Sequence, residues 1–367
     1  MKNKLKIPYV NLAMQYKNDG KELLNEIDNV LSSGQYILSE KVDEFENNIC
    51  EKLKVKFCIS VNSGTDALIL SLLALGIEKN DEVITQSNSY IATAAAINAV
   101  GAKPVFADVL DDQTIDPESV KKLISKKTKI IMPVHLTGRM CEMNEIMSIA
   151  KKHKLKVVED SAQSFGSKYF EKYSGTMGDC GAFSVHPLKN LNACGDGGFI
   201  VTNNKRISEN LKLRRNNGHI SRDKIKFWGT VSRLDSIQAA ILNYRLKKVD
   251  SVINKRIENA ELYSFFLNKN FVKLPKPRHY AFDTYHLFVI QVEKRDKLKS
   301  FLKKNNIETA IHYPIPIHKQ KFLKFSNSLF NTELQSEKIL SLPINQFMNK
   351  KKIRIVSDHI NYFFEKK

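Results

Sequence analysis

The chain has 367 residues and a hydrophobic content of 42%, which is enough to bury a full core and to divide into two domains. Its formal net charge is +19, but the lysines are spread over the whole chain without the arginine and aromatic interleaving of a nucleic-acid surface, so we expect no nucleic-acid partner. The sequence has no uncharged run of membrane-spanning length and no apolar signal segment, so we expect a cytoplasmic protein with no membrane partner. Its five cysteines lack a Cys-x-x-Cys pair, so we expect no disulfide framework and no metal site.

Helical patterns alternate with short apolar runs, as in an α/β protein with a mostly parallel sheet. The sequence predicts helices over residues 42–50, 65–75, 91–100 and 143–153, and strands over residues 81–84, 104–108, 130–134, 155–159 and 198–202. After Gln238, one long helix running to about residue 268 leads out of this unit, and residues 284–292 form a strand of a smaller α+β domain. We therefore expect a large domain over residues 1–245 and a smaller C-terminal domain over residues 246–367.

In the segment at residues 63–68, small residues open an apolar helix. The free N–H groups of Gly64 and Thr65 at such a helix start can face a phosphate, and Ser184 can add a hydroxyl. An ordinary helix N-cap is the alternative, because it has the same sequence pattern.

Asp160 ends the apolar run that begins at Leu155, where a parallel strand delivers a carboxylate to the carboxyl edge of a sheet. Gln163 follows it and can donate a hydrogen bond to a cofactor oxygen. The alternative for Asp160 alone is a turn residue that ends a strand.

Lys189 lies between the apolar pair Ala182-Phe183 and the buried strand predicted over residues 198–202. A glycine-rich turn at residues 195–198 follows Lys189 and leads into that strand. These neighbours place it on a loop between core elements and not on a solvated face. A lysine held there can lose its proton and form a Schiff base with an aldehyde, which is the chemistry of pyridoxal phosphate (PLP). Tyr90 could lay its ring on the cofactor, although a lone aromatic residue is more often part of a core.

Taken together, these segments resemble the DegT/StrS family of PLP-dependent nucleotide-sugar aminotransferases. The resemblance runs from about Pro8 to about Asn345. It rests on the segments at residues 63–68, 81–84, 159–163, 184–198, 233–240 and 312–318.

The resemblance implies fold type I of PLP enzymes, which is the aspartate aminotransferase-like fold, and a homodimer with shared active sites. Lys189 would hold the cofactor covalently and move protons, and Asp160 would pair with the pyridine nitrogen. Gly64, Thr65, Tyr90, Gln163 and Ser184 would complete the cofactor site. The substrate site would be formed by Tyr36, His186, Arg233, Tyr313 and His318.

The implied reaction moves an amino group from glutamate to a keto group of a dTDP- or UDP-linked deoxysugar, for amino-sugar or surface polysaccharide biosynthesis. The segment at residues 312–318 is similar to relatives that aminate C3. Two departures from the family pattern are Val231, where many relatives place an asparagine that reaches the partner's cofactor phosphate, and Ser39, where relatives often have glycine. A PLP-dependent lyase, a sugar dehydratase of the same fold and a non-catalytic regulator are the alternatives.

Overall fold

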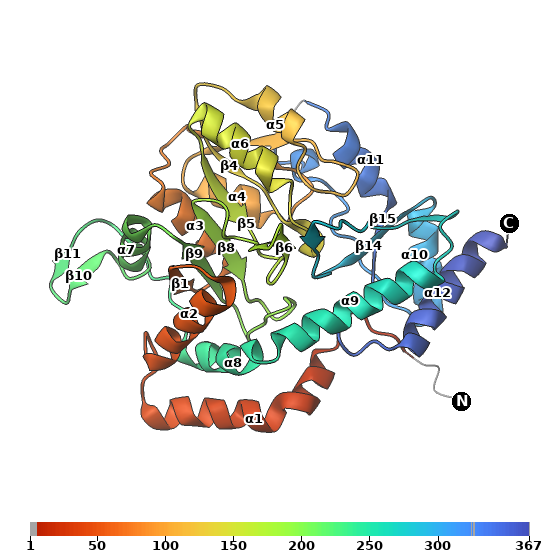
Figure 1. Ribbon diagram of the computed structural model, residues 1–367, viewed down its shortest axis with the longest axis horizontal. Coiled ribbons are helices and arrows are strands. Elements are labelled where there is room, and N and C mark those ends of the chain that lie inside the picture. The colour runs from red at the N-terminus through yellow and green to blue at the C-terminus, as the bar shows by residue number, and fades with distance from the viewer. Residues whose placement is uncertain (1–5, 324, 326, 367) are drawn as a thin grey trace.

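A seven-stranded sheet forms the centre of the protein, in the order β1-β9-β8-β5-β4-β2-β3 (Figure 1). The computed structural model describes residues 6–323, 325 and 327–366. The strands from β8 to β3 are parallel to their neighbours, whereas β9 runs antiparallel to both β1 and β8. The strands are β1 (Phe57–Val61), β2 (Glu82–Gln86), β3 (Lys103–Ala107), β4 (Thr128–Met132), β5 (Lys156–Asp160), β8 (Cys180–Ser184) and β9 (Gly198–Thr202).

Helices cover both faces of this sheet, which is why its strands are buried along almost their whole length. Leu68, Ile97 and Leu211 pack on one face, from α3 (Gly64–Ala74), α4 (Ala92–Ala99) and α7 (Lys205–Arg214). The other face is covered by α2 (Glu40–Leu53), α5 (Pro117–Leu123), α6 (Met143–His153) and α8 (Ser236–Leu246). The predicted α/β class with a mostly parallel sheet is confirmed.

A smaller antiparallel sheet, β12 (Val272–Lys273), β14 (Phe288–Val292) and β15 (Ile339–Leu342), lies in the C-terminal third. It shares a hydrophobic core with α9 (Val249–Phe266), α10 (Arg295–Lys304) and α12 (Lys350–Glu365). Ile7, near the start of the described chain, bridges to Ile307 and joins this core. The division at residues 245 and 246, which falls at the end of α8, stays a prediction.

The remaining elements connect or extend these two units. They are α1 (Leu12–Ser33), the 3-10 turns η1 (Leu136–Gly138) and η2 (Ile317–Lys319), the short strands β6 (Lys168–Tyr169), β7 (Lys172–Tyr173) and β13 (Ala281–Phe282), the hairpin β10 (His219–Ser221) and β11 (Lys224–Ile225), and α11 (Phe330–Lys338). The hairpin projects from the body at the left of Figure 1.

Two predicted elements differ from the structure. The single long helix after Gln238 is two helices, because α8 packs on the core of the large sheet and α9 extends to the core of the C-terminal sheet. The predicted strand over residues 284–292 begins only at Phe288, since Tyr285 has a positive φ of 47° that a strand does not accommodate. The other predicted strands and helices are present with ends shifted by a few residues.

Within the described residues, no helix is both long enough and apolar enough to cross a bilayer. The same part of the chain contains no cluster of side chains that could hold a metal ion, and its five cysteines are free thiols.

Candidate active site

Three strand ends and one helix start meet at one edge of the central sheet. The parallel strands β4, β5 and β8 end there, and α3 begins beside them. Between them lies a pocket of about 490 Å³. Its walls contain many of the predicted site residues, namely Gly64, Thr65, Tyr90, Asp160, Gln163, Ser184, His186, Lys189 and Tyr313.

Asp160 lies at the base of this pocket, where β5 ends. Its side chain is buried, and Thr93 donates a hydrogen bond of 2.8 Å to its Oδ2 atom. The backbone N–H of Ala162 donates to Oδ1 over 3.2 Å. Burial raises the pKa of Asp160, while the two hydrogen bonds and the positive charge of Lys189 oppose that increase. The fixed carboxylate is therefore held toward the pocket, ready for a cationic partner.

Lys189 reaches the same pocket from the loop that follows β8. The loop is tightly fixed, since the Lys189 N–H donates to His186 O over 2.8 Å and the Asn192 side chain donates to Pro187 O over 2.8 Å. Burial lowers the pKa of Lys189 to about 8, and Asp160 acts in the opposite direction. An amine with this pKa can gain and lose a proton near neutral pH.

The start of α3 presents the backbone N–H groups that an anion requires. Ser63 caps the helix and accepts a hydrogen bond of 3.1 Å from the Asp66 N–H. A Cβ atom at Gly64 would lie 2.6 Å from the Ser184 Cβ, so only glycine allows the helix start to approach the end of β8 this closely. This approach places the N-terminus of α3 in the wall of the pocket.

Two tyrosines and one glutamine form the mouth of the pocket. The rings of Tyr90 and Tyr313 are tilted, with centroids 5.7 Å apart, and Tyr90 is 58% exposed. Gln163 donates to the Tyr313 hydroxyl over 3.3 Å and accepts from the Thr137 N–H over 2.8 Å. Tyr90 therefore lines the pocket with a ring that is accessible to a flat ligand.

Three predicted substrate residues lie outside this pocket. The Tyr36 hydroxyl donates to Leu31 O over 3.3 Å on an exposed surface. Arg233 donates to Asn216 over 3.3 Å from the segment that precedes α8. His318 is buried against Ser87, at 2.6 Å, and Glu333, at 3.2 Å, so its ring faces the protein and not the pocket of its own chain.

Three residues of the pocket were not assigned a site role from the sequence. Thr93 holds Asp160, but the two residues are 67 positions apart and no spacing pattern connects them. The sequence predicts His286 inside a strand, and the positive φ of Tyr285 that interrupts this strand next to His286 has no sequence signature. His312 begins the segment at residues 312–318, and burial together with Lys189 lowers its pKa to about 4.

The opposite face of β5 carries a closed polar cluster around Glu159. One carboxylate oxygen accepts from the N–H groups of Met177 (2.7 Å) and Gly178 (2.6 Å), and the other accepts from Gly175 N–H (2.8 Å). The His135 Nε2 atom lies 2.9 Å from the second oxygen, and both side chains are fully buried. Glu159 is thus saturated by the protein itself.

Comparisons with known proteins agree over almost the whole chain. A family model described as the DegT/DnrJ/EryC1/StrS aminotransferase family matches residues 17–361. A dTDP-3-amino-3,6-dideoxy-alpha-D-galactopyranose transaminase of Aneurinibacillus thermoaerophilus is 40% identical, with 97% of this chain and 99% of the relative covered.

Two solved structures have the same fold. The crystal structure of S. venezuelae DesV in complex with a ketimine intermediate has a TM-score of 0.96 and 35% identity, and the comparison covers 99% of each chain. The structure of ntda from Bacillus subtilis with bound cofactor pmp has a TM-score of 0.93 and 30% identity, with 100% of this chain and 87% of that chain covered.

Proposed function

The chain belongs to the DegT/DnrJ/EryC1/StrS aminotransferase family, and from this premise we propose that it transfers an amino group from glutamate to a keto group of a nucleotide-linked deoxysugar. It is a PLP-dependent enzyme of the aspartate aminotransferase-like fold. The observation that carries the proposal is the single pocket that holds Lys189, Asp160 and the start of α3.

The residues of the pocket fit PLP. The start of α3 at Gly64 and Thr65, with Ser184 beside it, offers donors for the phosphate, and the buried Asp160 offers a negative charge for a protonated ring nitrogen. Tyr90 would lie against the ring, and Gln163 would contact a ring oxygen. When bound, the cofactor supplies an aldehyde that accepts the amino group and a ring that takes up negative charge.

The protein's own groups then control two protons. The Asp160 carboxylate would hold a proton at the ring nitrogen, because its negative charge favours the protonated ring in a site of low dielectric. The Nζ atom of Lys189, with a pKa near 8, would take a proton from the reacting carbon of the amino donor in one half-reaction and would deliver a proton to the former keto carbon of the sugar in the other. The same two residues serve both the amino donor and the keto sugar.

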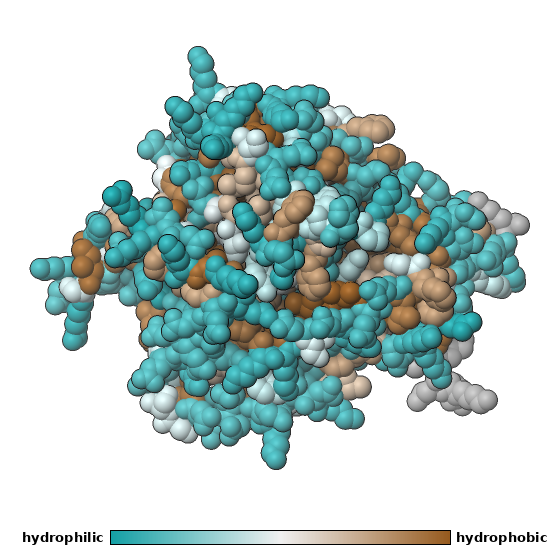
Figure 2. Space-filling model, viewed as in Figure 1, coloured by the Kyte–Doolittle hydropathy of each residue, from teal (hydrophilic) through white to brown (hydrophobic). Residues whose placement is uncertain are grey.

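We further propose that the protein is a homodimer with shared sites. The hairpin of β10 and β11 projects from the body (Figure 1), and hydrophobic atoms stand out on it (Figure 2). Its side chains Ile220 and Ile225 are exposed, and Trp228, which follows the hairpin, is 95% exposed. A second copy would cover these side chains. Tyr36 and Arg233 lie outside the pocket of their own chain, which is expected if they complete the pocket of the partner.

The substrate side of the proposal follows from these positions. His186 and Tyr313 line the pocket and would contact the sugar. Arg233 would hold the diphosphate, for which its planar guanidinium is suited. For His318 we propose an indirect role, since it is buried against Ser87 and supports the loop that carries Tyr313.

We propose that the substrate is a dTDP-linked sugar that is aminated at C3, in amino-sugar or surface polysaccharide biosynthesis. We also propose that the enzyme acts in the cytoplasm, where cysteines such as its free thiols stay reduced. A regulator that has lost turnover is less favoured, because the pocket retains Lys189 and Asp160 together. A lyase would also keep these two residues, and it is less favoured because it would not require Arg233 and the segment at residues 312–318, and because the relatives are transaminases. A dehydratase is less favoured because related dehydratases usually replace this lysine by histidine.

The test is a panel of dTDP- and UDP-linked 3-keto and 4-keto deoxysugars, incubated with the holoenzyme and glutamate and followed by mass. We expect the dTDP-linked 3-keto sugar to gain an amino group, and the Lys189→Ala variant to give none. An unchanged mass for every sugar would reject the proposed function.

The shared site is tested by mixing Lys189→Ala protein with Arg233→Ala protein. Random exchange makes half of the dimers hybrids, each with one intact site of two, so about a quarter of the wild-type activity should return. Subunit exchange confirmed by mass, without recovered activity, would mean that Arg233 does not serve the partner's site.

A further inference from the structure

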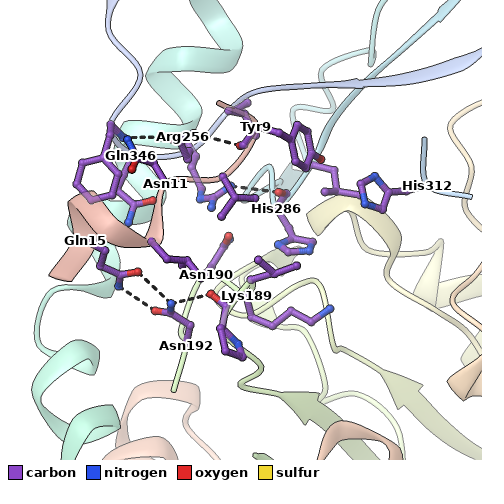
Figure 3. A pocket seen from close by; sticks show the side chains of 18 residues that line it. Tyr9, Asn11, Gln15, Lys189, Asn190, Asn192, Arg256, His286, His312 and Gln346 are labelled. Carbon is purple, nitrogen blue, oxygen red and sulfur yellow. Dashed lines mark hydrogen bonds between the residues drawn. The ribbon is translucent and has the colours of Figure 1, made fainter. Parts of the chain in front are cut away.

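A second, smaller cavity of about 80 Å³ adjoins the active-site pocket (Figure 3). It lies between the N-terminal segment around Tyr9, the loop that carries Lys189 and Asn190, and Arg256 of α9. Leu188, Lys189, His286 and His312 line both this cavity and the larger pocket, so the two hollows share a wall.

Buried polar atoms without a partner are concentrated around this cavity. Among the described residues, the Nε atom of Arg256, the Oδ1 atom of Asn190 and the Nδ1 atom of His286 have no hydrogen-bond partner in the protein. All three side chains are more than nine-tenths buried. Since a buried polar atom without a partner costs free energy, this concentration indicates a ligand or ordered water in the cavity.

The cavity is positively charged. Arg256 and Lys189 belong to its wall, and no aspartate or glutamate does so within the described part of the chain. Arg256 donates only to the backbone oxygens of Tyr285 (3.4 Å) and His286 (3.1 Å), and neither of these carries a charge. Burial lowers the pKa of Arg256 to about 10. A buried guanidinium without a counter-charge favours an anion from outside the chain.

Figure 3 shows how the positive charge of Arg256 lies relative to Lys189. In this view the His286 ring lies between Arg256 and the Lys189 amine, and Lys189 lines the cavity. Burial and the surrounding positive charges hold the pKa of His286 well below its usual value, so its ring is neutral and its Nδ1 atom can accept or donate.

We propose that the cavity beside Arg256 binds a carboxylate of the amino-acid donor, and this proposal rests on the proposed function. Any amino acid that gives its amino group at Lys189 carries a carboxylate within a few bonds of that group. The cavity is too small for a sugar or a diphosphate but has room for a carboxylate. The guanidinium would bind it through its free Nε–H, and the positive cavity would select an acidic donor over an uncharged amine.

The test compares Arg256→Met with Arg245→Met in the holoenzyme. Arg245 is a matched control, because it is also buried, donates to two backbone oxygens (Asn192 O at 2.8 Å and Ala193 O at 3.2 Å) and has a free Nε, but does not line the cavity. The two half-reactions are measured separately, one with glutamate alone and one with the amino sugar product alone.

We expect Arg256→Met to raise the dissociation constant for glutamate about tenfold to a hundredfold, as for loss of a charge-assisted hydrogen bond. The half-reaction with the amino sugar should stay within about twofold of wild type, and Arg245→Met should leave both unchanged. Arg256→Lys should recover part of the glutamate affinity. An equal loss in both half-reactions, or an unchanged dissociation constant for glutamate, would overturn the proposal.

A second readout does not depend on turnover. Glutarate, an unreactive dicarboxylate, should bind to wild-type holoenzyme in calorimetry and should lose that binding in Arg256→Met but not in Arg245→Met. If the keto-sugar panel fails and glutarate still binds through Arg256, then the proposed sugar substrate is wrong and the carboxylate site stands. Equal glutarate binding by all variants would leave only water in the cavity and reject the site.

Discussion

The two faces of β5 at its carboxyl end carry adjacent carboxylates in opposite environments. Glu159 faces a closed cluster, in which three backbone N–H groups and His135 occupy its oxygens. Asp160 faces the pocket, where only Thr93 and the Ala162 N–H bind it. Neighbouring residues of a strand point to opposite faces, so one residue step separates a structural acid from one available to a ligand.

The comparison is informative because both carboxylates are buried, so burial alone does not distinguish them. What differs is whether the protein supplies all the partners. A carboxylate whose hydrogen bonds are all made within the protein contributes to folding. A carboxylate that can still accept a hydrogen bond from the pocket can act on a bound molecule. Substitutions on the two sides should therefore separate stability from activity.

The largest effect is expected for Asp160→Asn. The amide keeps the shape of the side chain but loses the charge that would hold the cofactor ring protonated, so the transamination rate should fall by about a hundredfold to a thousandfold. The urea midpoint of unfolding should change little. A near-normal rate would remove Asp160 from the mechanism.

Glu159→Gln should show the reverse pattern. The amide keeps one acceptor oxygen, so its nitrogen faces either the N–H groups of Met177 and Gly178 or the N–H group of Gly175 and leaves them without an acceptor. The partner His135 also stays buried without its negative charge, so the free energy of unfolding should fall by about 3 kcal/mol. Activity per folded molecule should stay within a few-fold of wild type. If activity falls with unchanged stability, the assignment of the two faces is reversed.

Thr93→Val should have a smaller effect on the open side. Valine has nearly the same shape but cannot donate to the Asp160 Oδ2 atom, and loss of this bond raises the pKa of Asp160 further. We expect the transamination rate to fall about tenfold, with recovery in Thr93→Ser, which keeps the hydroxyl. A rate in Thr93→Ser as low as in Thr93→Val would point to packing instead.

The smallest effect concerns the titration of Lys189 in protein freed of cofactor. Its pKa is lowered from 10.5 to about 8, so at pH 9 its amine is mostly neutral while ordinary lysines stay protonated. Acylation of Lys189, followed by peptide mass mapping, should therefore rise with pH around a midpoint near 8. Because Asp160 raises this pKa, Asp160→Asn should move the midpoint lower, and a midpoint above 10 would contradict the burial of Lys189.

The sequence predicted the part of this site that is local in the chain. Lys189, Asp160 and Gly64 each belong to a short segment whose strand, turn or helix start can be recognised from neighbouring residues. The structure brings these segments into one pocket as expected.

The remainder depends on contacts between distant segments. Thr93 is recognisable only once α4 is packed beside β5, and Arg256 is, in the sequence, one charged residue among many on a long helix. Its burial follows from packing against residues 285 and 286, which no periodicity indicates. Ser39, where relatives often have glycine, caps α2 and bonds to Ser236, which is likewise a contact between distant segments.

The antiparallel strand β9 has a consequence for the order in which the protein can form during synthesis. β1 pairs with β9, from Phe57 opposite Thr202 to Val61 opposite Gly198, so about 140 residues must leave the ribosome before β1 acquires its neighbour. The start of α3 is positioned only then, because Ser63 lies directly against Gly198. A nascent chain that stops before β9 would therefore carry Asp160 but have no assembled phosphate site, and cofactor capture should follow the completion of this sheet.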